Sequence, residues 1–377
     1  MEENSNFPKN LLTSDSNEKV DYFEKFFIKH DKFDMVSNEI INWRNITSGR
    51  NLIVIVGPPA SGKTTSIKRL HESDIENNGN FSSIFLEVPA FYDRIFDWEA
   101  FYQLIAKKIH DPFYDKKGYT LGKKSKKDKI ELLRNSIADQ VKLRGMNTFY
   151  LDEAHRFNRI SKSDFYKNQM ENIQYFTSIS EVLFIMAGTY ELLNLLEFQP
   201  QLARRTLVIP FSRFNFDIEF FSILGIFEKQ LPLYKTPDLI SNADYLYHGS
   251  LGCLGLLKDW LLDALKLSIN PNSSNDFFKN LHVTQPNEKT LIEIINDIEK
   301  GEQDINKFLS KDLKVIKERM KLIEPNIGVQ EILTSSPNDI SPTDASHMGS
   351  SSSLKKHSKK HRVGVMKPRR IPVGNIE

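Results

Sequence analysis

The sequence contains a single cysteine, Cys253, among 377 residues. A lone cysteine cannot form a disulfide within the chain, which fits a reducing compartment such as the cytoplasm. No stretch reaches the roughly 20 consecutive apolar residues of a membrane-spanning helix. The acidic, polar start at residues 1–4 does not resemble a signal peptide. We therefore expect a cytoplasmic protein with no membrane association.

An excess of charge of one sign is also missing. The chain has 51 Lys and Arg residues against 49 Asp and Glu residues, so its formal net charge is only +2. A net charge this close to zero does not indicate a nucleic-acid or acidic partner, and only local clusters of charge are informative. The length allows two or three domains, and no internal repeat is evident.

One complete motif is present: residues 57–64 read GPPASGKT, the phosphate-loop pattern G-x-x-x-x-G-K-[ST]. The apolar run 51–56 before it predicts a buried parallel strand, and residues 65–70 after it predict the start of a helix. In this context backbone N–H groups and the helix N-terminus surround a phosphate chain, the lysine contacts the terminal phosphates, and the last hydroxyl binds Mg²⁺. The sequence therefore predicts a site for ATP and Mg²⁺. The expected nucleotide-binding residues are Gly57, Pro58, Pro59, Ala60, Ser61, Gly62, Lys63, Thr64 and Thr65.

Two acidic residues end another predicted strand. Residues 148–151 are predicted to form this strand, and Asp152 and Glu153 follow directly. We expect Asp152 to bind Mg²⁺ together with Thr64, and Glu153 to orient and deprotonate the attacking water. Solvated carboxylates at an exposed strand end are the alternative, so this assignment depends on the phosphate loop upstream. His155 is either a polar switch near the γ-phosphate or a simple loop residue.

Two further elements supply catalytic candidates. Thr189 follows a predicted strand and could sense the γ-phosphate or help to hold the water. The segment 201–205 precedes the predicted strand 206–209, where oligomeric ATPases supply an arginine to the γ-phosphate of a neighbouring protomer. We expect Arg205, in preference to Arg204, to be such a finger. An arginine pair on a solvated helix end is the alternative.

Predicted strands alternate with predicted helices up to residue 210, and the pattern is purely helical afterwards. This alternation predicts the α/β class: a three-layer αβα domain with a parallel five-stranded sheet covered on both faces. The tail after about residue 325 is rich in serine and proline and ends in a basic cluster. We expect a flexible arm at 1–20, the αβα core with N-terminal helices at 21–210, a small helical lid at 211–270, a helical extension at 271–325, and a disordered tail with a basic C-terminal segment at 326–377.

The densest basic stretch before the tail runs from Lys116 to Lys129. Lysines that neutralise phosphates supply most of the non-specific affinity for DNA. We therefore consider contact with double-stranded DNA, independent of its sequence, and equally a solvated loop whose charges are screened by salt. The candidate residues are Lys116, Lys117, Lys123, Lys124, Lys126 and Lys127.

Four segments together resemble those of AAA+ ATPases and, more narrowly, of the TnsC/TniB family of transposition regulators: GPPASGKTT at 57–65, FYLDEAH at 149–155, IMAGTYELL at 185–193 and QLARR at 201–205. The resemblance covers about residues 30–265. It implies a bacterial protein encoded by a mobile element, which binds ATP between protomers and assembles into rings or helical filaments on double-stranded DNA. It also implies that the protein links a target-site selector, TniQ/TnsD-like, to the transposase, and that hydrolysis disassembles the filament.

One departure from the AAA+ pattern concerns the second-sensor arginine at the start of a lid helix. The corresponding segment 249–255 is rich in glycine and contains no arginine, and Lys258 lies too far along the chain to replace it. Two alternative functions also stay open. One is a replication-initiator or helicase-loader-like AAA+ ATPase, although no additional DNA-reading domain is visible. The other is a nucleotide-binding scaffold with little turnover, against which Glu153 argues.

Overall fold

The computed structural model describes residues 6–44, 51–77, 82–90, 96–112, 125–158, 163–197, 206–270, 273–274 and 276–323. Its contacts divide the chain into two units, Met1–Arg319 and Met320–Glu377. The first unit contains a five-stranded sheet and a helical part. The second includes the tail expected at 326–377, which lies outside the described residues. No helix in the described part is both long and apolar enough to cross a membrane.

The sheet is parallel throughout and has the strand order β2-β3-β4-β1-β5. The prediction of a parallel five-stranded sheet is therefore confirmed. The strand bounds are β1 (Leu52–Val56), β2 (Ser82–Glu87), β3 (Met146–Asp152), β4 (Leu183–Gly188) and β5 (Thr206–Pro210).

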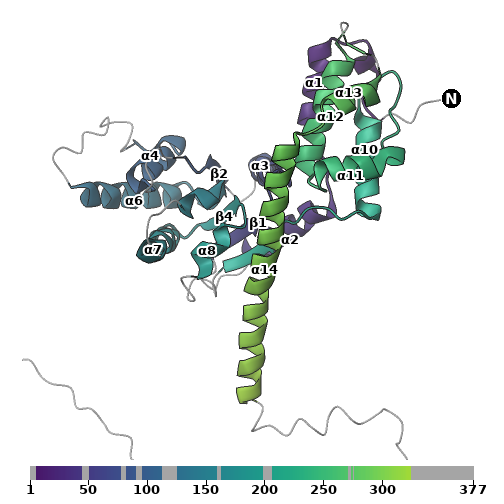
Figure 1. The fold of residues 1–377 in the computed structure, drawn as a ribbon. Helices are drawn as coiled ribbons and strands as arrows, with labels where there is room; N and C mark the ends of the chain where they lie inside the picture. The colour runs from purple at the N-terminus through teal and green to yellow at the C-terminus, as the bar shows by residue number, and fades with distance from the viewer. Residues whose placement is uncertain are drawn as a thin grey trace, which may run out of the picture. The chain divides into compact units, whose positions relative to one another are not determined.

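Both faces of the central strand β1 are buried, as its continuous apolar sequence predicts. Alternate residues of a strand point to opposite faces, and Val54 belongs to one apolar cluster while Ile53 and Ile55 belong to another. Two groups of helices cover these faces and form the three expected layers (Figure 1). One group is α2 (Asp31–Arg44) and α3 (Lys63–Glu76); the other is α4 (Trp98–Lys108), α6 (Lys126–Leu143), α7 (Ser163–Ser180) and α8 (Leu192–Glu197).

The strand order brings the predicted motifs to one edge of the sheet. Strand β1 pairs with β4, so that Val56 lies opposite Gly188, and β3 pairs with β4 on its other side. The carboxyl ends of parallel strands meet at the same edge, which is where ligands bind in open α/β sheets. The phosphate loop after β1, the acids at the end of β3 and Thr189 after β4 therefore share this edge.

A third apolar cluster, separate from the two on the faces of the sheet, forms the core of the helical part. Phe23 of α1 is completely buried in this cluster, with its ring centroid 5.8 Å from that of Phe227. Helix α1 therefore joins the helical part, whereas we expected it in the αβα core, and α13 extends the helical part beyond residue 270. The helices that contribute are α1 (Ser16–Lys25), α10 (Ile218–Gln230), α11 (Ala243–Ser250), α12 (Leu254–Ser268) and α13 (Phe277–Val283).

Short 3-10 helices and one long helix complete the described elements. The first 3-10 helix, η1 (Lys9–Leu12), and the start of α1 occupy much of residues 6–20, where we expected a flexible arm. The others are η2 (Ala154–Asn158) and η3 (Ile240–Asn242), and the long helix is α14 (Glu288–Ile323). Helices α13 and α14 occupy most of the expected extension at 271–325.

Several helices begin at a side chain that accepts hydrogen bonds from the backbone N–H groups of the first turn. Helix α3 differs, because it begins after Gly62 and has no side-chain cap. The N-terminus of α3 can therefore receive an anion where five of the other helices have a carboxylate or hydroxyl, and α11 and α12 also begin without a side-chain cap. The capping residues are Asp15, Asp97, Ser125, Asp217 and Asp276.

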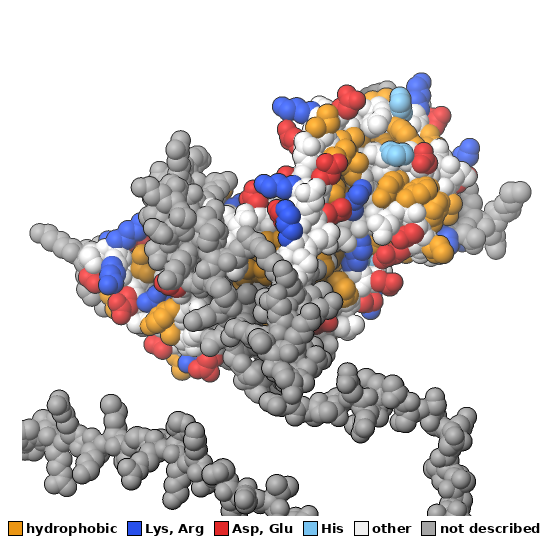
Figure 2. Space-filling model, turned by 60° about the horizontal axis from the view of Figure 1, so that its bottom comes forward, with side chains coloured by type: hydrophobic (Ala, Val, Ile, Leu, Met, Phe, Trp, Pro, Cys, Tyr) orange, Lys and Arg blue, Asp and Glu red, His pale blue; other side chains and the backbone are white. Residues whose placement is uncertain are grey.

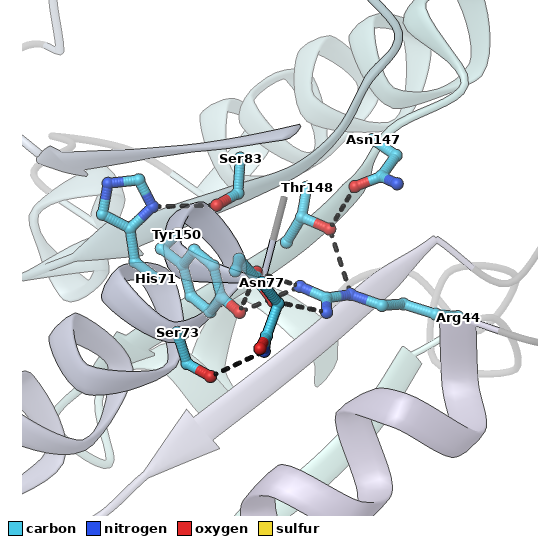
Figure 3. A network of polar contacts seen from close by, with 9 residues as sticks. Arg44, His71, Ser73, Asn77, Ser83, Asn147, Thr148 and Tyr150 are labelled. Carbon is cyan, nitrogen blue, oxygen red and sulfur yellow. Dashed lines mark hydrogen bonds and ion pairs between the residues drawn. The ribbon is translucent and has the colours of Figure 1, made fainter. Parts of the chain in front are cut away.

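A largely buried polar network joins α2 and α3 to β3 (Figure 3). The guanidinium of Arg44 pairs with the carboxylate of Asp74, and the two side chains are only 8% and 12% exposed. Arg44 also donates to the Tyr150 hydroxyl at 2.9 Å and to the Thr148 hydroxyl at 3.2 Å. The Tyr150 hydroxyl donates to Asp74 at 2.8 Å, and burial raises the pKa of this hydroxyl above its usual range. The network thus stabilises the layer that carries the phosphate loop.

Replacing Asp74 with alanine should lower the free energy of unfolding by about 3–5 kcal/mol, because it leaves the buried Arg44 guanidinium without its carboxylate. Urea denaturation followed by circular dichroism measures this loss. Asp263→Ala is the matched control, since Asp263 pairs with Lys266 on the surface and should contribute about 0–1 kcal/mol. Equal losses for the two variants would show that the network around Asp74 does not stabilise the fold.

Candidate functional site

The phosphate loop turns sharply between β1 and α3, and the structure explains why glycine occupies positions 57 and 62. A side chain at Gly57 would overlap the backbone carbonyl of Phe211. Gly62 has φ +101° and Ala60 has φ +54°, both in the left-handed region, which is costly for a residue other than glycine. These two residues bend the loop so that α3 can begin at Lys63.

The Lys63 ammonium is buried inside the loop, and the hydrogen bonds that it makes to the described residues all go to neutral acceptors. Its Nζ donates to the carbonyl oxygens of Gly57 at 3.0 Å and Pro58 at 2.6 Å, and to the Ser61 hydroxyl at 3.2 Å. Burial lowers the pKa of Lys63 to about 8, although the nearby carboxylates of Asp152 and Glu153 oppose this shift. A phosphate oxygen would be a stronger acceptor than these carbonyls, because a hydrogen bond between two charged groups is the stronger kind.

Thr64 and Asp152, 88 residues apart in the sequence, meet at the edge of the sheet. The Thr64 hydroxyl donates to Asp152 Oδ1 at 3.1 Å. Burial raises the pKa of the Asp152 carboxyl, and the hydrogen bond from Thr64 opposes this shift. Hydroxyl and carboxylate oxygens are ligands that Mg²⁺ accepts, usually together with substrate phosphates and water. The described residues hold no group of three or more His, Cys, Asp or Glu side chains that could bind a metal, so a Mg²⁺ ion here would need those additional ligands.

Glu153 follows Asp152 with φ +53°, an unusual conformation for a glutamate. Its carboxylate is 37% exposed, and Oε2 lies 3.6 Å from Nδ1 of His155 and 3.7 Å from a guanidinium nitrogen of Arg156. Burial lowers the pKa of His155, and the nearby carboxylate of Glu153 opposes this shift. The carboxylate is thus held at the sheet edge with one face open to solvent, which suits a group that contacts a water molecule.

Arg156 is a site residue that the sequence interpretation missed. Its Nη1 donates to the carboxylate of Glu87 at 2.8 Å and to the carbonyl of Val88 at 2.6 Å, both at the end of β2. Its other nitrogen lies beside Glu153, so Arg156 links the end of β2 to the acidic end of β3. The available signal was the position of Arg156 three residues after Glu153, which allows contact only if a helical turn follows the strand.

Thr189 lies across from these acids, at the end of β4. Its hydroxyl is buried and has no hydrogen-bond partner within the described structure, and the same is true of Nδ1 of His155. A side chain at Gly188 would come within 2.9 Å of the His155 backbone nitrogen, so β4 and η2 approach closely. A buried hydroxyl without a protein partner is uncommon in folded proteins and is available to bind a ligand or a water molecule. The structure therefore brings Lys63, Asp152, Glu153, His155 and Thr189 together.

A pocket beside the start of α3 was not predicted from the sequence. It is mostly apolar and aromatic, and it includes the buried Ser66 hydroxyl, which has no partner in the described part of the chain. Such a surface fits a flat heteroaromatic ring with one polar contact. Four distant segments build it, which is why no local pattern revealed it. The pocket is lined by Phe26, Phe27, Ile28, His30, Gly62, Thr65, Ser66, Phe227, Leu254, Gly255 and Lys258.

The glycine-rich segment 249–255 contacts the phosphate loop directly. The Gly255 N–H donates to the Ala60 carbonyl at 2.7 Å, and a side chain at Gly255 would lie 2.6 Å from that oxygen. Lys258 does not replace the missing second-sensor arginine. Its ammonium donates to the carbonyls of Glu24 and Phe26, both at 2.7 Å, and thereby caps the C-terminus of α1.

The remaining predicted residues are only partly described. Arg204 and Arg205 lie outside the described residues, as do four of the DNA candidates, Lys116, Lys117, Lys123 and Lys124. Lys126 and Lys127 are exposed at the start of α6, and Lys126 pairs with Asp97 at 3.2 Å. On the face shown in Figure 2, Lys and Arg side chains are interspersed with Asp and Glu over the described residues.

Comparisons with solved structures find similar but distant folds. The ORC2 protein of Aeropyrum pernix, in ADPNP–ADP complexes, is 14% identical over 71% of this chain and 70% of its own, with a TM-score of 0.45. A Walker-type ATPase of Pyrococcus abyssi is 14% identical over 77% and 78%, with a TM-score of 0.47. The ORC1 protein of Aeropyrum pernix, in complex with DNA, is 14% identical over 75% and 70%, also with a TM-score of 0.47.

The comparison with family models is more informative. Residues 45–196 match the model described as an AAA domain. No curated protein matches the chain. The matched range holds the phosphate loop, the Thr64–Asp152 pair, Glu153 and Thr189. The match to an AAA domain thus covers β1 to β4 and ends before β5.

Proposed function

We propose that this protein is an ATPase that binds ATP with Mg²⁺ in its AAA domain and uses hydrolysis to time its assembly on double-stranded DNA, as a regulator of DNA transposition. The observation that carries the ATPase part is the convergence of a buried ammonium, a hydroxyl–carboxylate pair and an unpaired hydroxyl at one edge of the sheet. These are Lys63, Thr64 with Asp152, and Thr189.

The residues present fit a nucleotide. The phosphate loop and the uncapped start of α3 offer backbone N–H groups to a phosphate chain, and Lys63 has only neutral partners among its identified hydrogen bonds to exchange for phosphate oxygens. The apolar pocket beside the start of α3 has the character that a purine base needs, and within the described part of the chain the Ser66 hydroxyl has no hydrogen-bond partner. The Thr64–Asp152 pair would hold Mg²⁺, which neutralises charge on the phosphates when bound.

In this proposal each side chain has one task. Lys63 holds the terminal phosphates, and Thr189 donates to the γ-phosphate or to the water. Glu153 orients the attacking water and accepts its proton as the bond to phosphorus forms. Arg156 keeps the Glu153 carboxylate at the edge of the sheet through its contacts with Glu87 and Val88.

The finer part of the proposal is supported by the sequence motifs. They resemble those of transposition regulators at segments 57–65, 149–155, 185–193 and 201–205. In this proposal Arg205, or else Arg204, reaches the site of a neighbouring protomer, and basic residues near Lys126 and Lys127 contact DNA. A target selector and a transposase are the protein partners that this function requires.

ATP turnover should be measured with and without non-specific double-stranded DNA, and the same samples imaged in a slowly hydrolysed ATP analogue. We expect turnover together with DNA-dependent rings or filaments that disappear when ATP is hydrolysed. Turnover indifferent to DNA from a monomeric particle would remove the DNA assembly and leave the ATPase. ATP binding with no turnover under either condition would favour a nucleotide-binding scaffold.

A further inference from the structure

Helix α14 lies against the side of the nucleotide site that carries Thr189, the residue directly after β4. A hollow of about 730 Å³, part of it open to solvent, separates the two. The AAA domain lines it with Pro59 of the phosphate loop, His155 and Thr189, and α14 lines it with Asp297, Gly301 and Asp304. The Thr189 hydroxyl and Nδ1 of His155, which have no hydrogen-bond partner among the described residues, belong to residues that line this hollow.

The contact that holds α14 here depends on a glycine. A side chain at Gly301 would overlap the ring of Tyr190, so this ring lies directly against the helix backbone. Gly301 is buried in the middle of a 36-residue helix, although glycine weakens a helix by about 1 kcal/mol relative to alanine. Tyr190 follows Thr189 directly, so the position of α14 and the position of the Thr189 hydroxyl are mechanically linked.

Helix α14 also joins the AAA domain to the helical part. Ile294 and Ile298 pack in a cluster with Cys253, two residues before the Gly255 N–H that bonds to the phosphate loop. One to two turns further along α14, Ile305 belongs to the apolar cluster of the sheet, together with Tyr190. A shift of α14 would therefore be felt on both sides of the nucleotide site.

The charges around the hollow oppose an additional anion. Three carboxylates, of Glu191, Asp297 and Asp304, line it together with one ammonium, of Lys300. The carboxylate of Asp304 also lies 3.8 Å from the ammonium of Lys307, which is exposed and therefore offsets its negative charge only weakly. Burial lowers the pKa of His155, which disfavours the positively charged form of its ring. A γ-phosphate beside Thr189 would add negative charge to this surface, whereas ADP would not.

We propose that α14 is a strap that closes the γ-phosphate side of the nucleotide site. Repulsion between the γ-phosphate and the carboxylates of Asp297 and Asp304 releases this strap when ATP is bound, but not when ADP is bound. The proposal rests on the nucleotide site proposed above. Docking of α14 and binding of the γ-phosphate compete, so the two carboxylates weaken the binding of ATP relative to ADP. By linkage, ATP weakens the docking of α14 by the same factor.

Hydrogen exchange measured by mass spectrometry on the full chain tests the strap. The samples are the Glu153→Gln variant, which prevents turnover, without nucleotide, with ADP and with ATP, and nucleotide binding is verified by calorimetry in each. We expect backbone amides of residues 294–308 to exchange about fivefold faster or more with ATP than with ADP. ATP that binds and leaves these amides as protected as ADP does would overturn the strap alone. Failure of ATP to bind would overturn the proposed function, and the strap with it.

Three further variants separate the charges from the contact. Asp297→Asn with Asp304→Asn should tighten ATP relative to ADP by about fivefold or more and abolish the ATP-dependent exchange. Glu293→Gln with Glu299→Gln removes the same charge from exposed positions of α14 that do not line the hollow, and should change neither quantity. Gly301→Ala should make residues 294–308 exchange rapidly in all three states. Equal effects of the two double variants would show that the carboxylates do not sense the γ-phosphate.

Discussion

Replacing Glu153 with glutamine should lower ATP turnover by about 10²–10⁴-fold, the usual contribution of a positioned general base. Glutamine has nearly the same shape and keeps the same backbone conformation, so ATP should still bind. The amide cannot accept the proton of the attacking water, however. If hydrolysis drives disassembly, this variant should also remain on double-stranded DNA in the presence of ATP, where the parent protein dissociates.

The matched control for this change is Glu181→Gln. Glu181 also has a left-handed backbone, with φ +59°, but it lies after α7, where it pairs with Lys142 on the surface. Turnover by this variant should equal that of the parent. A steady-state phosphate-release assay measures both variants, and a DNA-retention assay with ATP measures the trapping. A Glu153→Gln variant that turns over ATP at the parent rate would rule out Glu153 as the base.

Replacing Lys63 with alanine should weaken ATP binding by about 30-fold or more, equivalent to at least 2 kcal/mol. The reason is that Lys63 is a buried ammonium whose hydrogen bonds now go to carbonyl and hydroxyl oxygens, and a phosphate is the stronger acceptor. Titration with a fluorescent ATP analogue measures the affinity. Lys142→Ala removes an exposed lysine on α6 and should leave the affinity unchanged.

The same lysine predicts a pH dependence of binding. Its pKa is about 8 in this structure because burial disfavours the charged form, so the ammonium is present below about pH 8 and is lost as the pH rises. A bound phosphate favours the ammonium and raises the pKa in the complex. ATP affinity of the parent should therefore fall as the pH increases from 8 towards 10, while the Lys63→Ala variant should lack this fall. An equal fall of ATP affinity in the parent and in the Lys63→Ala variant would show that another group titrates.

The local sequence pattern was sufficient for the architecture of the AAA domain. The strands expected at 51–56, 148–151 and 206–209 lie within two residues of the observed bounds of β1, β3 and β5, because a run such as Leu52–Val56 is apolar at every position and so must be buried on both faces. The proximity of Thr64 and Asp152 was also predictable, since both follow parallel strands and such strands end at one edge of the sheet. Helix α1 was misplaced because an amphipathic helix shows which face is buried but not which partner covers it.

The parts of the site that escaped prediction are those assembled from distant segments. Arg156 reaches Glu87 only because β2 and β3 are neighbours in the sheet, and strand order is not a local property. The apolar pocket beside Ser66 combines residues from the N-terminal segment, the phosphate loop with the start of α3, α10 and α12. The sequence around Gly301 carries no sign that the ring of Tyr190 lies against the helix backbone there.

The sequence by itself determined the chemistry available to this protein: a phosphate loop, two acids at a strand end and a polar residue after a neighbouring strand. These are local signals, since each depends on residue types at fixed spacing within one strand–turn unit. Only the tertiary structure decided which groups surround that chemistry, namely the arginine beside Glu153, the apolar pocket and the acidic face of α14. Those contacts depend on long-range packing of apolar faces, and the periodicity of one segment carries no record of the segment that packs against it.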